Sequence, residues 1–123
     1  MEEVLFDVQL EVREVRRGEV KDLDIVRSSA EGMDVLIELP RNLIQIKEGK
    51  HIRLIVSESE VEEVDGLFAC TIYKVEKQKE RKNGFVKVYG SIGGLQVRIE
   101  AENEELQRKI KMGDKVFIGI KVL

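Results

Sequence analysis

Apolar and polar residues alternate one for one along most of this chain, and no other feature restricts its fold as strongly. The pattern runs through residues 6–12, returns at 33–39 until Pro40 ends it, and returns again at 52–56. Because successive side chains of a β-strand point to opposite faces, each stretch predicts a half-buried strand.

Turn residues separate the other predicted strands. Glycines lie at Asn83-Gly84, Gly93-Gly94 and Gly113-Asp114. One short helix is predicted near 103–111, where Leu106 and Ile110 are four residues apart. The remaining strands are predicted at 67–76, 84–92, 95–101 and 115–122, with a weaker one near 22–28. About eight short strands at this spacing are typical of an all-β sandwich or barrel.

The sequence also contains an internal repeat. Residues 35–38 recur 62 positions later at 97–100, and Leu5-Phe6 recurs at the same offset as Leu67-Phe68. Residues 46–56 match 110–120, now 64 positions later. We therefore predict that 1–123 is a single domain of two pseudo-symmetric halves, about 4–56 and 67–122, joined by an acidic loop at 57–66. Closure of both halves into one antiparallel barrel would remove the exposed strand edges of either half.

Composition restricts the class of protein. Charged residues make up 37% of the chain, yet the net charge is −3, which does not favour a free-standing nucleic-acid binder. An acidic start with no apolar segment after it, and no apolar run of about 20 residues, predict a cytoplasmic protein without a membrane span. The single cysteine, Cys70, excludes a disulfide framework and is expected to be a buried small apolar residue.

The residues that enzymes need for chemistry are scarce. His51 is the only histidine, and it has no acidic or nucleophilic neighbour in the sequence. General acid–base catalysis requires an oriented partner group, and a metal site requires a set of ligands. We therefore expect no catalytic residues, no metal site and no cofactor.

Two segments are candidates for binding. Lys77, Lys79, Arg81 and Lys82 form a basic hairpin tip that could contact a phosphate backbone, although no aromatic residue lies within it for base stacking. This tip supports one alternative, a stand-alone single-stranded nucleic-acid-binding protein.

The second candidate is the segment from Tyr89 to Glu100. Gly93-Gly94 is explained equally well by a tight hairpin turn or by the close approach of a partner's backbone. In the second interpretation, Leu95 anchors in a pocket of the partner and Arg98 pairs with a carboxylate. The residues alone leave both interpretations open.

This segment resembles the signature of a known family. The string Tyr89-x-Ser91-x-Gly93-Gly94-Leu95-x-x-Arg98-x-Glu100 is similar to the hallmark of the subunit-eight family of multi-subunit DNA-directed RNA polymerases, whose archaeal member is also called the G subunit. Two further stretches, 5–15 and 73–76, resemble other strands of that family in the same order. The resemblance extends over about 5–122.

The resemblance implies a barrel related to the OB fold and a non-catalytic auxiliary role. It implies binding to the outside of the polymerase on its largest subunit, with a structural or assembly role in transcription and no small-molecule substrate. The docking residues would be Tyr89, Ser91, Gly93, Gly94, Leu95 and Arg98. The chain departs from eukaryotic members in its short loop at 57–66 and its non-basic final strand, 116–120, and it resembles an archaeal member instead.

Overall fold

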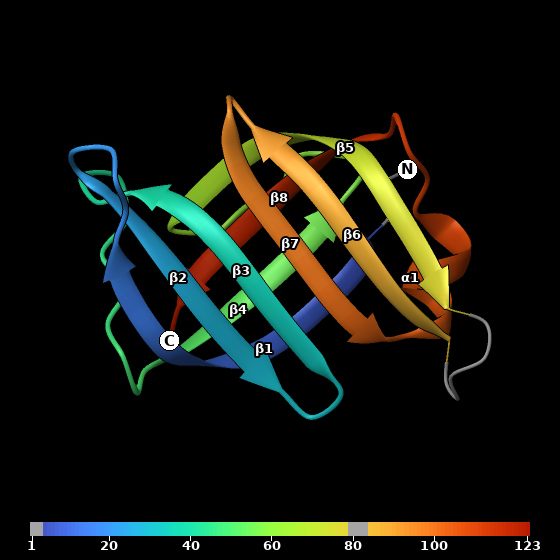
Figure 1. Ribbon diagram of the computed structural model, residues 1–123, viewed down its shortest axis with the longest axis horizontal. Helices are drawn as coiled ribbons and strands as arrows, with labels where there is room; N and C mark the ends of the chain where they lie inside the picture. The colour runs from blue at the N-terminus through green and yellow to red at the C-terminus, as the bar shows by residue number, and fades with distance from the viewer. Residues whose placement is uncertain (1–3, 79–83) are drawn as a thin grey trace.

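Eight antiparallel strands and one short helix make up the computed structural model, which describes residues 4–78 and 84–123 (Figure 1). The strands close into a barrel in the order β1-β2-β3-β7-β6-β5-β8-β4, which confirms the predicted closed antiparallel barrel. No helix in the described ranges is both long and apolar enough to cross a membrane. The elements are β1 (Val4–Arg17), β2 (Leu23–Ala30), β3 (Met33–Pro40), β4 (His51–Ser57), β5 (Gly66–Gln78), β6 (Phe85–Ile92), β7 (Leu95–Glu102), α1 (Glu104–Lys109) and β8 (Lys115–Val122).

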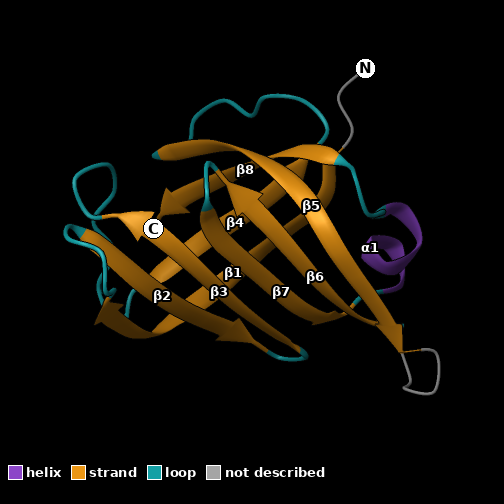
Figure 2. Ribbon diagram, turned by 45° about the horizontal axis from the view of Figure 1, so that its top comes forward, coloured by secondary structure: helices purple, strands orange, loops and turns teal. Residues whose placement is uncertain are grey.

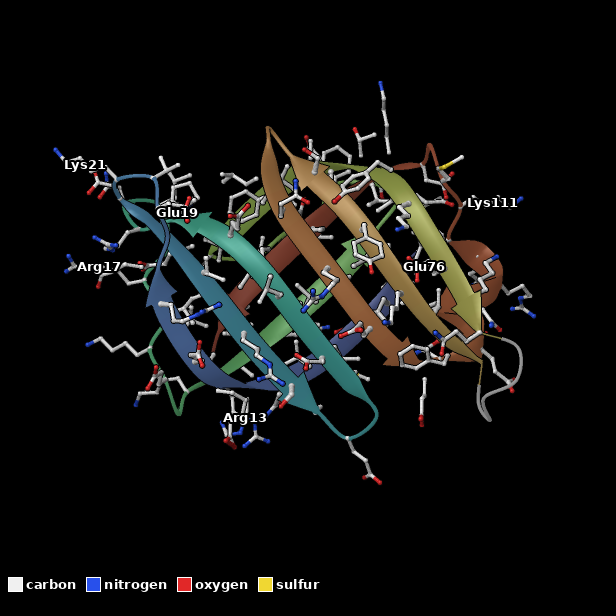
Figure 3. The ribbon with its side chains drawn as sticks, viewed as in Figure 1. Arg13, Arg17, Glu19, Lys21, Glu76 and Lys111 are labelled. Carbon is white, nitrogen blue, oxygen red and sulfur yellow. The ribbon has the colours of Figure 1, made fainter. Side chains whose placement is uncertain are left out.

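The period of two separates the barrel interior from its outer wall. Residues such as Leu10, Leu54 and Ile120 fill the interior and are fully buried, and Cys70 is buried among them as expected. The polar residues between them face outward, and His51 is exposed. Charged side chains such as Arg17 and Lys21 point away from the ribbon in Figure 3.

Two segments outside the strands add apolar side chains to the core. Ile44 and Ile46, which follow β3, are buried in one half, and Leu106 and Ile110 of the α1 region are buried in the other. The side chain of Asn103 caps α1 by accepting a hydrogen bond from the amide of Leu106 at 2.9 Å. The predicted helix is therefore confirmed, with its regular part shorter than 103–111.

Hydrogen bonds identify equivalent positions in the two halves. The amide of Val12 donates to the carbonyl of Lys50 at 2.8 Å, and the amide of Ile72 donates to the carbonyl of Asp114 at 2.8 Å. Val12 and Ile72 also both precede a β-bulge, in β1 and in β5. They are therefore counterparts, 60 residues apart in sequence.

This equivalence corrects one match of the predicted repeat. Phe6 pairs with Val56, whereas the counterpart of Val56, Ile120, pairs with Gly66. Phe6 therefore corresponds to Gly66, and its predicted match with Phe68 is wrong. The reason is that 17 residues separate Ile72 from its partner Gly90, whereas 15 separate Val12 from its partner Ser28. The second hairpin is therefore two residues longer, and the offset of 62 applies only to the strands after it.

The later matches hold, and they locate an approximate twofold axis. Leu36 of β3 pairs with Arg98 of β7, its own counterpart at the offset of 62. Ile55 of β4 pairs with Gly119 of β8, its counterpart at the offset of 64. A residue can pair with its own counterpart only where the axis crosses the wall, so the axis enters at Leu36–Arg98 and leaves at Ile55–Gly119.

The acidic segment 57–66 lies over one of these crossings. A Cβ atom built on Gly119 would be 3.1 Å from Cγ1 of Val64 and 3.6 Å from Cβ of Val61. The amide of Asp65 donates to the carbonyl of Ile120 at 2.9 Å. The connection between the halves is therefore a packed cover on β4 and β8, and Figure 2 shows it as a loop arching over β8.

Candidate docking surface

The β6–β7 turn leaves two glycines bare at the rim of the barrel. Ile92 and Leu95 form the last pair of the hairpin, and Gly93 and Gly94 between them have φ angles of 61° and 93°. Positive φ at both central residues is the requirement of a two-residue hairpin turn of type I′, which glycine meets without strain. A Cβ atom at either glycine would have no neighbour within 4 Å among the residues that the structure describes, and both glycines are exposed.

Ser91 supports this turn from within the chain. Its Oγ atom accepts a hydrogen bond from the amide of Gly94 at 3.2 Å. The bond satisfies a backbone donor that the turn would otherwise leave to water. The position of Ser91 is therefore explained by the geometry of the turn.

Leu95 and Arg98 point to opposite sides of β7. Leu95 has the parity of the buried residues Val97 and Ile99, is half-buried, and packs against the core. Arg98 lies on the outer wall, where its side chain is 43% exposed. The structure thus divides the six predicted docking residues between the rim (Gly93, Gly94 and Leu95) and the outer wall (Tyr89, Ser91 and Arg98).

Tyrosine side chains gather on the outer wall beside Arg98. Tyr89 pairs with Arg98 across the β6–β7 ladder, and the Tyr73 ring lies 6.3 Å from the Tyr89 ring at a tilt of 44°. Nζ of Lys74 lies 5.2 Å from the centre of the Tyr89 ring, within the range of a cation–π contact. Tyr73 also donates a hydrogen bond from its hydroxyl to Oε1 of Gln96.

Sequence reasoning missed Tyr73 as a site residue. The β-bulge between Ile72 and Lys74 breaks the alternation, so Tyr73 and Lys74 are consecutive and both exposed. A strict period of two would place one of them inside the barrel. The alternation of β5 weakens after Ile72, and that weakening was the available signal.

Most charges on this wall are already paired. The hydrogen bond between Lys74 and Glu76, at 2.9 Å, raises the pKa of Lys74 and lowers the pKa of Glu76. Lys87 holds Oε1 of Glu100 at 3.3 Å, and Nε of Arg98 lies 3.9 Å from Oε2 of the same carboxylate. Within the described part of the chain, Arg98 therefore has only a long contact with a carboxylate that is shared with Lys87.

The predicted basic tip lies mostly outside the described residues. Lys77 is exposed at the end of β5, where it pairs with Val86. Lys79, Arg81 and Lys82 fall in the range 79–83, which the structure does not describe. Any contact of the tip with nucleic acid stays a prediction.

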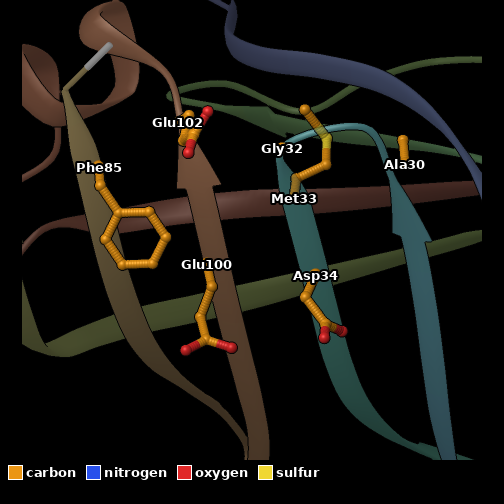
Figure 4. A pocket seen from close by; sticks show the side chains of 7 residues that line it. All are labelled: Ala30, Gly32, Met33, Asp34, Phe85, Glu100 and Glu102. Carbon is orange, nitrogen blue, oxygen red and sulfur yellow. The ribbon is translucent and has the colours of Figure 1, made fainter. Parts of the chain in front are cut away.

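A shallow pocket lies where the β2–β3 turn faces the start of β6. Its lining is acidic and apolar, and Figure 4 shows its carboxylates spread along two strands rather than turned to one point. No group of three or more potential metal ligands was found among the described residues. The pocket is lined by Ala30, Gly32, Met33, Asp34, Phe85, Glu100 and Glu102.

Comparisons with known proteins identify the family. No curated protein matches the sequence. The model of one protein family, RpbG, the G subunit of DNA-directed RNA polymerase, matches residues 5–122, which is nearly the whole chain and includes both the rim and the outer wall. The chain therefore belongs to the RpbG family of DNA-directed RNA polymerase subunits.

Proposed function

We propose that this protein is a non-catalytic auxiliary subunit of an archaeal, cytoplasmic RNA polymerase and docks on the outside of its largest subunit. The observation that carries the proposal is the family match over 5–122 together with the exposed position of the signature hairpin. In this role the protein contributes a binding surface and structural support, and the chemistry of transcription belongs to other subunits.

Closure of the barrel restricts how such a subunit can bind. Every strand has a neighbour on both sides in the barrel order, so no strand lies at an edge of the sheet. Contact is then expected mainly from side chains of the wall and from the exposed backbone of turns. The bare turn at Gly93-Gly94 suits this kind of contact, because no side chain holds a partner away from it.

A bulky residue at Gly94 tests the proposal. Gly94→Trp should reduce the amount of subunit retained by purified polymerase at least tenfold, because the indole would occupy the space of the partner. Gly113→Trp is a matched control, since Gly94 and Gly113 both have φ of 93° and open space at Cβ. Both variants carry the same backbone strain, so only the position differs.

Co-purification from polymerase assembled with each variant is the measurement. Retention of Gly94→Trp in full stoichiometry would show that the turn is not part of the interface. Equal loss of Gly113→Trp would attribute the effect to damaged folding. A wild-type chain absent from the purified polymerase would overturn the proposed function itself.

The Tyr73–Tyr89 pair supports a second candidate function, binding of single-stranded nucleic acid. Adjacent aromatic rings with a nearby cation are the kind of surface on which bases stack. Glu76 neutralises the nearby lysine, Lys74, which weakens this candidate. A titration of the isolated chain with single-stranded DNA decides it, because nucleic-acid affinity must fall steeply with rising salt.

A further inference from the structure

The two ends of the pseudo-twofold axis differ in what covers them. At one end, Ile55 faces outward from β4 and is only 5% exposed, because the segment 57–66 lies over it. At the other end, Leu36 is half-buried and Arg98 is 43% exposed at its side chain. Figure 1 looks onto this second end, and no described segment crosses β7 there.

The covered end shows which kind of segment suits this wall. Val61 and Val64 contact the space above Gly119, and acidic residues surround them in the sequence Val61-Glu62-Glu63-Val64-Asp65. The carboxylate of Asp65 accepts a hydrogen bond from the amide of Val122 at 2.6 Å. The segment 57–66 is therefore held on the wall by apolar contacts of its two valines and by a hydrogen bond to the carboxylate of Asp65.

The bare end of the axis has apolar and aromatic side chains against which a similar segment can pack. Leu36, Arg98 and Tyr89 lie side by side on β3, β7 and β6, as their backbone pairing shows. Tyr73 extends the row beside Tyr89. Tyrosine and arginine are enriched among the residues that supply most of the binding energy in protein interfaces.

Arg98 favours a carboxylate on the occupant of the bare end. The carboxylate of Glu38, on the same wall, is already engaged by the amide of Gln96, which donates to its Oε1 atom at 2.7 Å. Arg27, on the same wall, is satisfied by Asp34 through bonds of 2.9 and 3.3 Å. Arg98 has no comparable partner among the described residues, because its closest carboxylate, Glu100, is 3.9 Å away and is held by Lys87. An arginine with free donors binds a carboxylate in a bidentate manner.

We propose that the wall at Leu36–Arg98 binds an acidic segment of the polymerase, resembling the chain's own 57–66. An apolar side chain of that segment packs on Leu36 and Tyr89, and a neighbouring carboxylate pairs with Arg98. The inference rests on the proposed function, because it takes the occupant from the polymerase. The contact already proposed is at the Gly93-Gly94 turn. This inference adds a second contact and says which chemical groups the partner supplies there.

Site-specific photo-cross-linking in assembled polymerase tests the inference. Tyr89 is replaced by benzoylphenylalanine, which keeps an aromatic ring at this position, and the captured peptide is sequenced by mass spectrometry. The expected peptide contains at least one Asp or Glu beside an apolar residue. The same probe at His51, which is exposed on β4, is the control and should capture a different peptide or none.

Charge reversal then tests the role of Arg98. Arg98→Glu should reduce retention by polymerase at least tenfold, whereas Arg98→Lys should keep most of it. Changing the captured carboxylate to lysine should restore binding of Arg98→Glu. Both Arg98 variants should keep the wild-type urea midpoint, since this side chain is 43% exposed and its ion pair with Glu100 is long, at 3.9 Å.

The outcomes separate this inference from the proposed function. The subunit can co-purify while the Tyr89 probe captures nucleic acid, a peptide without carboxylates or nothing. That result would overturn the proposed acidic segment and leave the proposed function unaffected. Unchanged retention of Arg98→Glu does the same. A wild-type subunit that is not retained overturns the docking proposal first, and this inference with it.

Discussion

Gly90 of β6 faces the sulfur atom of Cys70 across the β5–β6 part of the barrel, with no room for a side chain between them. A Cβ atom built on Gly90 would lie 2.5 Å from Sγ of Cys70. The next neighbours, Cδ1 of Ile72 and the carbonyl of Thr71, are at ordinary distances of 3.4 and 3.5 Å. Among the described residues, the sulfur atom is therefore the single obstacle to a methyl group at position 90.

Gly90→Ala should destabilise the fold because the new methyl group collides with this sulfur. Inserting a methyl group into a packed core costs roughly 1–3 kcal/mol. Cys70→Ala removes the obstacle, so the double variant should be more stable than the sum of the two single effects predicts. Urea unfolding of the wild type and the three variants measures the coupling, and simple additivity would contradict the packing described.

The thiol of Cys70 should be chemically inert in the folded protein. Burial raises its pKa to about 11, and the side chain is 3% exposed. The thiolate is the reactive form, so a thiol reagent at pH 8 should label the native chain about 100-fold or more slowly than the urea-unfolded chain. Labelling followed by absorbance or mass provides the measurement, and similar rates in both states would show that the core opens readily.

The ion pair of Asp7 and Arg53 should give a small acid-dependent contribution to stability. Nε and a terminal nitrogen of Arg53 donate to the carboxylate at 2.9 and 2.6 Å, and this bonding lowers the pKa of Asp7. A lowered pKa means that the contribution is present above about pH 4 and is lost as pH falls through the folded-state value.

For a pair this exposed, the contribution should stay below about 1 kcal/mol. The measurement is the difference in unfolding free energy between wild type and Arg53→Gln, taken at pH 6 and at pH 3. The difference should shrink at pH 3. A difference that grows on acidification would mean that Asp7 is not stabilised as a carboxylate.

Val64 should hold the segment 57–66 on the barrel. Its Cγ1 atom contacts the wall above Gly119, so Val64→Asp should release the segment by placing a charge in an apolar contact. Cleavage by a glutamate-specific protease at Glu62 or Glu63 should accelerate severalfold. Glu58→Gln, an exposed change in the same segment, is the control and should leave the cleavage rate at those two sites unchanged.

Local pattern was sufficient to predict the strands. Alternation places one side chain in two against the core, and this local requirement identified the strands but fitted a sandwich as well as a barrel. The internal repeat and the family resemblance favoured the barrel. The alternation also contained information that the prediction did not use. Leu95 lies two residues before Val97 and four before Ile99, so all three face the same side of the strand, and its inward position could have been foreseen. Family membership was likewise contained in the string from Tyr89 to Glu100.

The tertiary structure decided which surfaces meet, because that depends on irregularities and on pairing between distant segments. The bulge after Ile72 brings Tyr73 and Lys74 to one face, and no period of two encodes it. Val64 looks like part of a charged loop in the sequence, and only the closed wall creates the gap over Gly119 that it fills. The sequence by itself determined the strands and the family, whereas closure of the barrel determined which end of the axis the chain covers and which end it leaves bare.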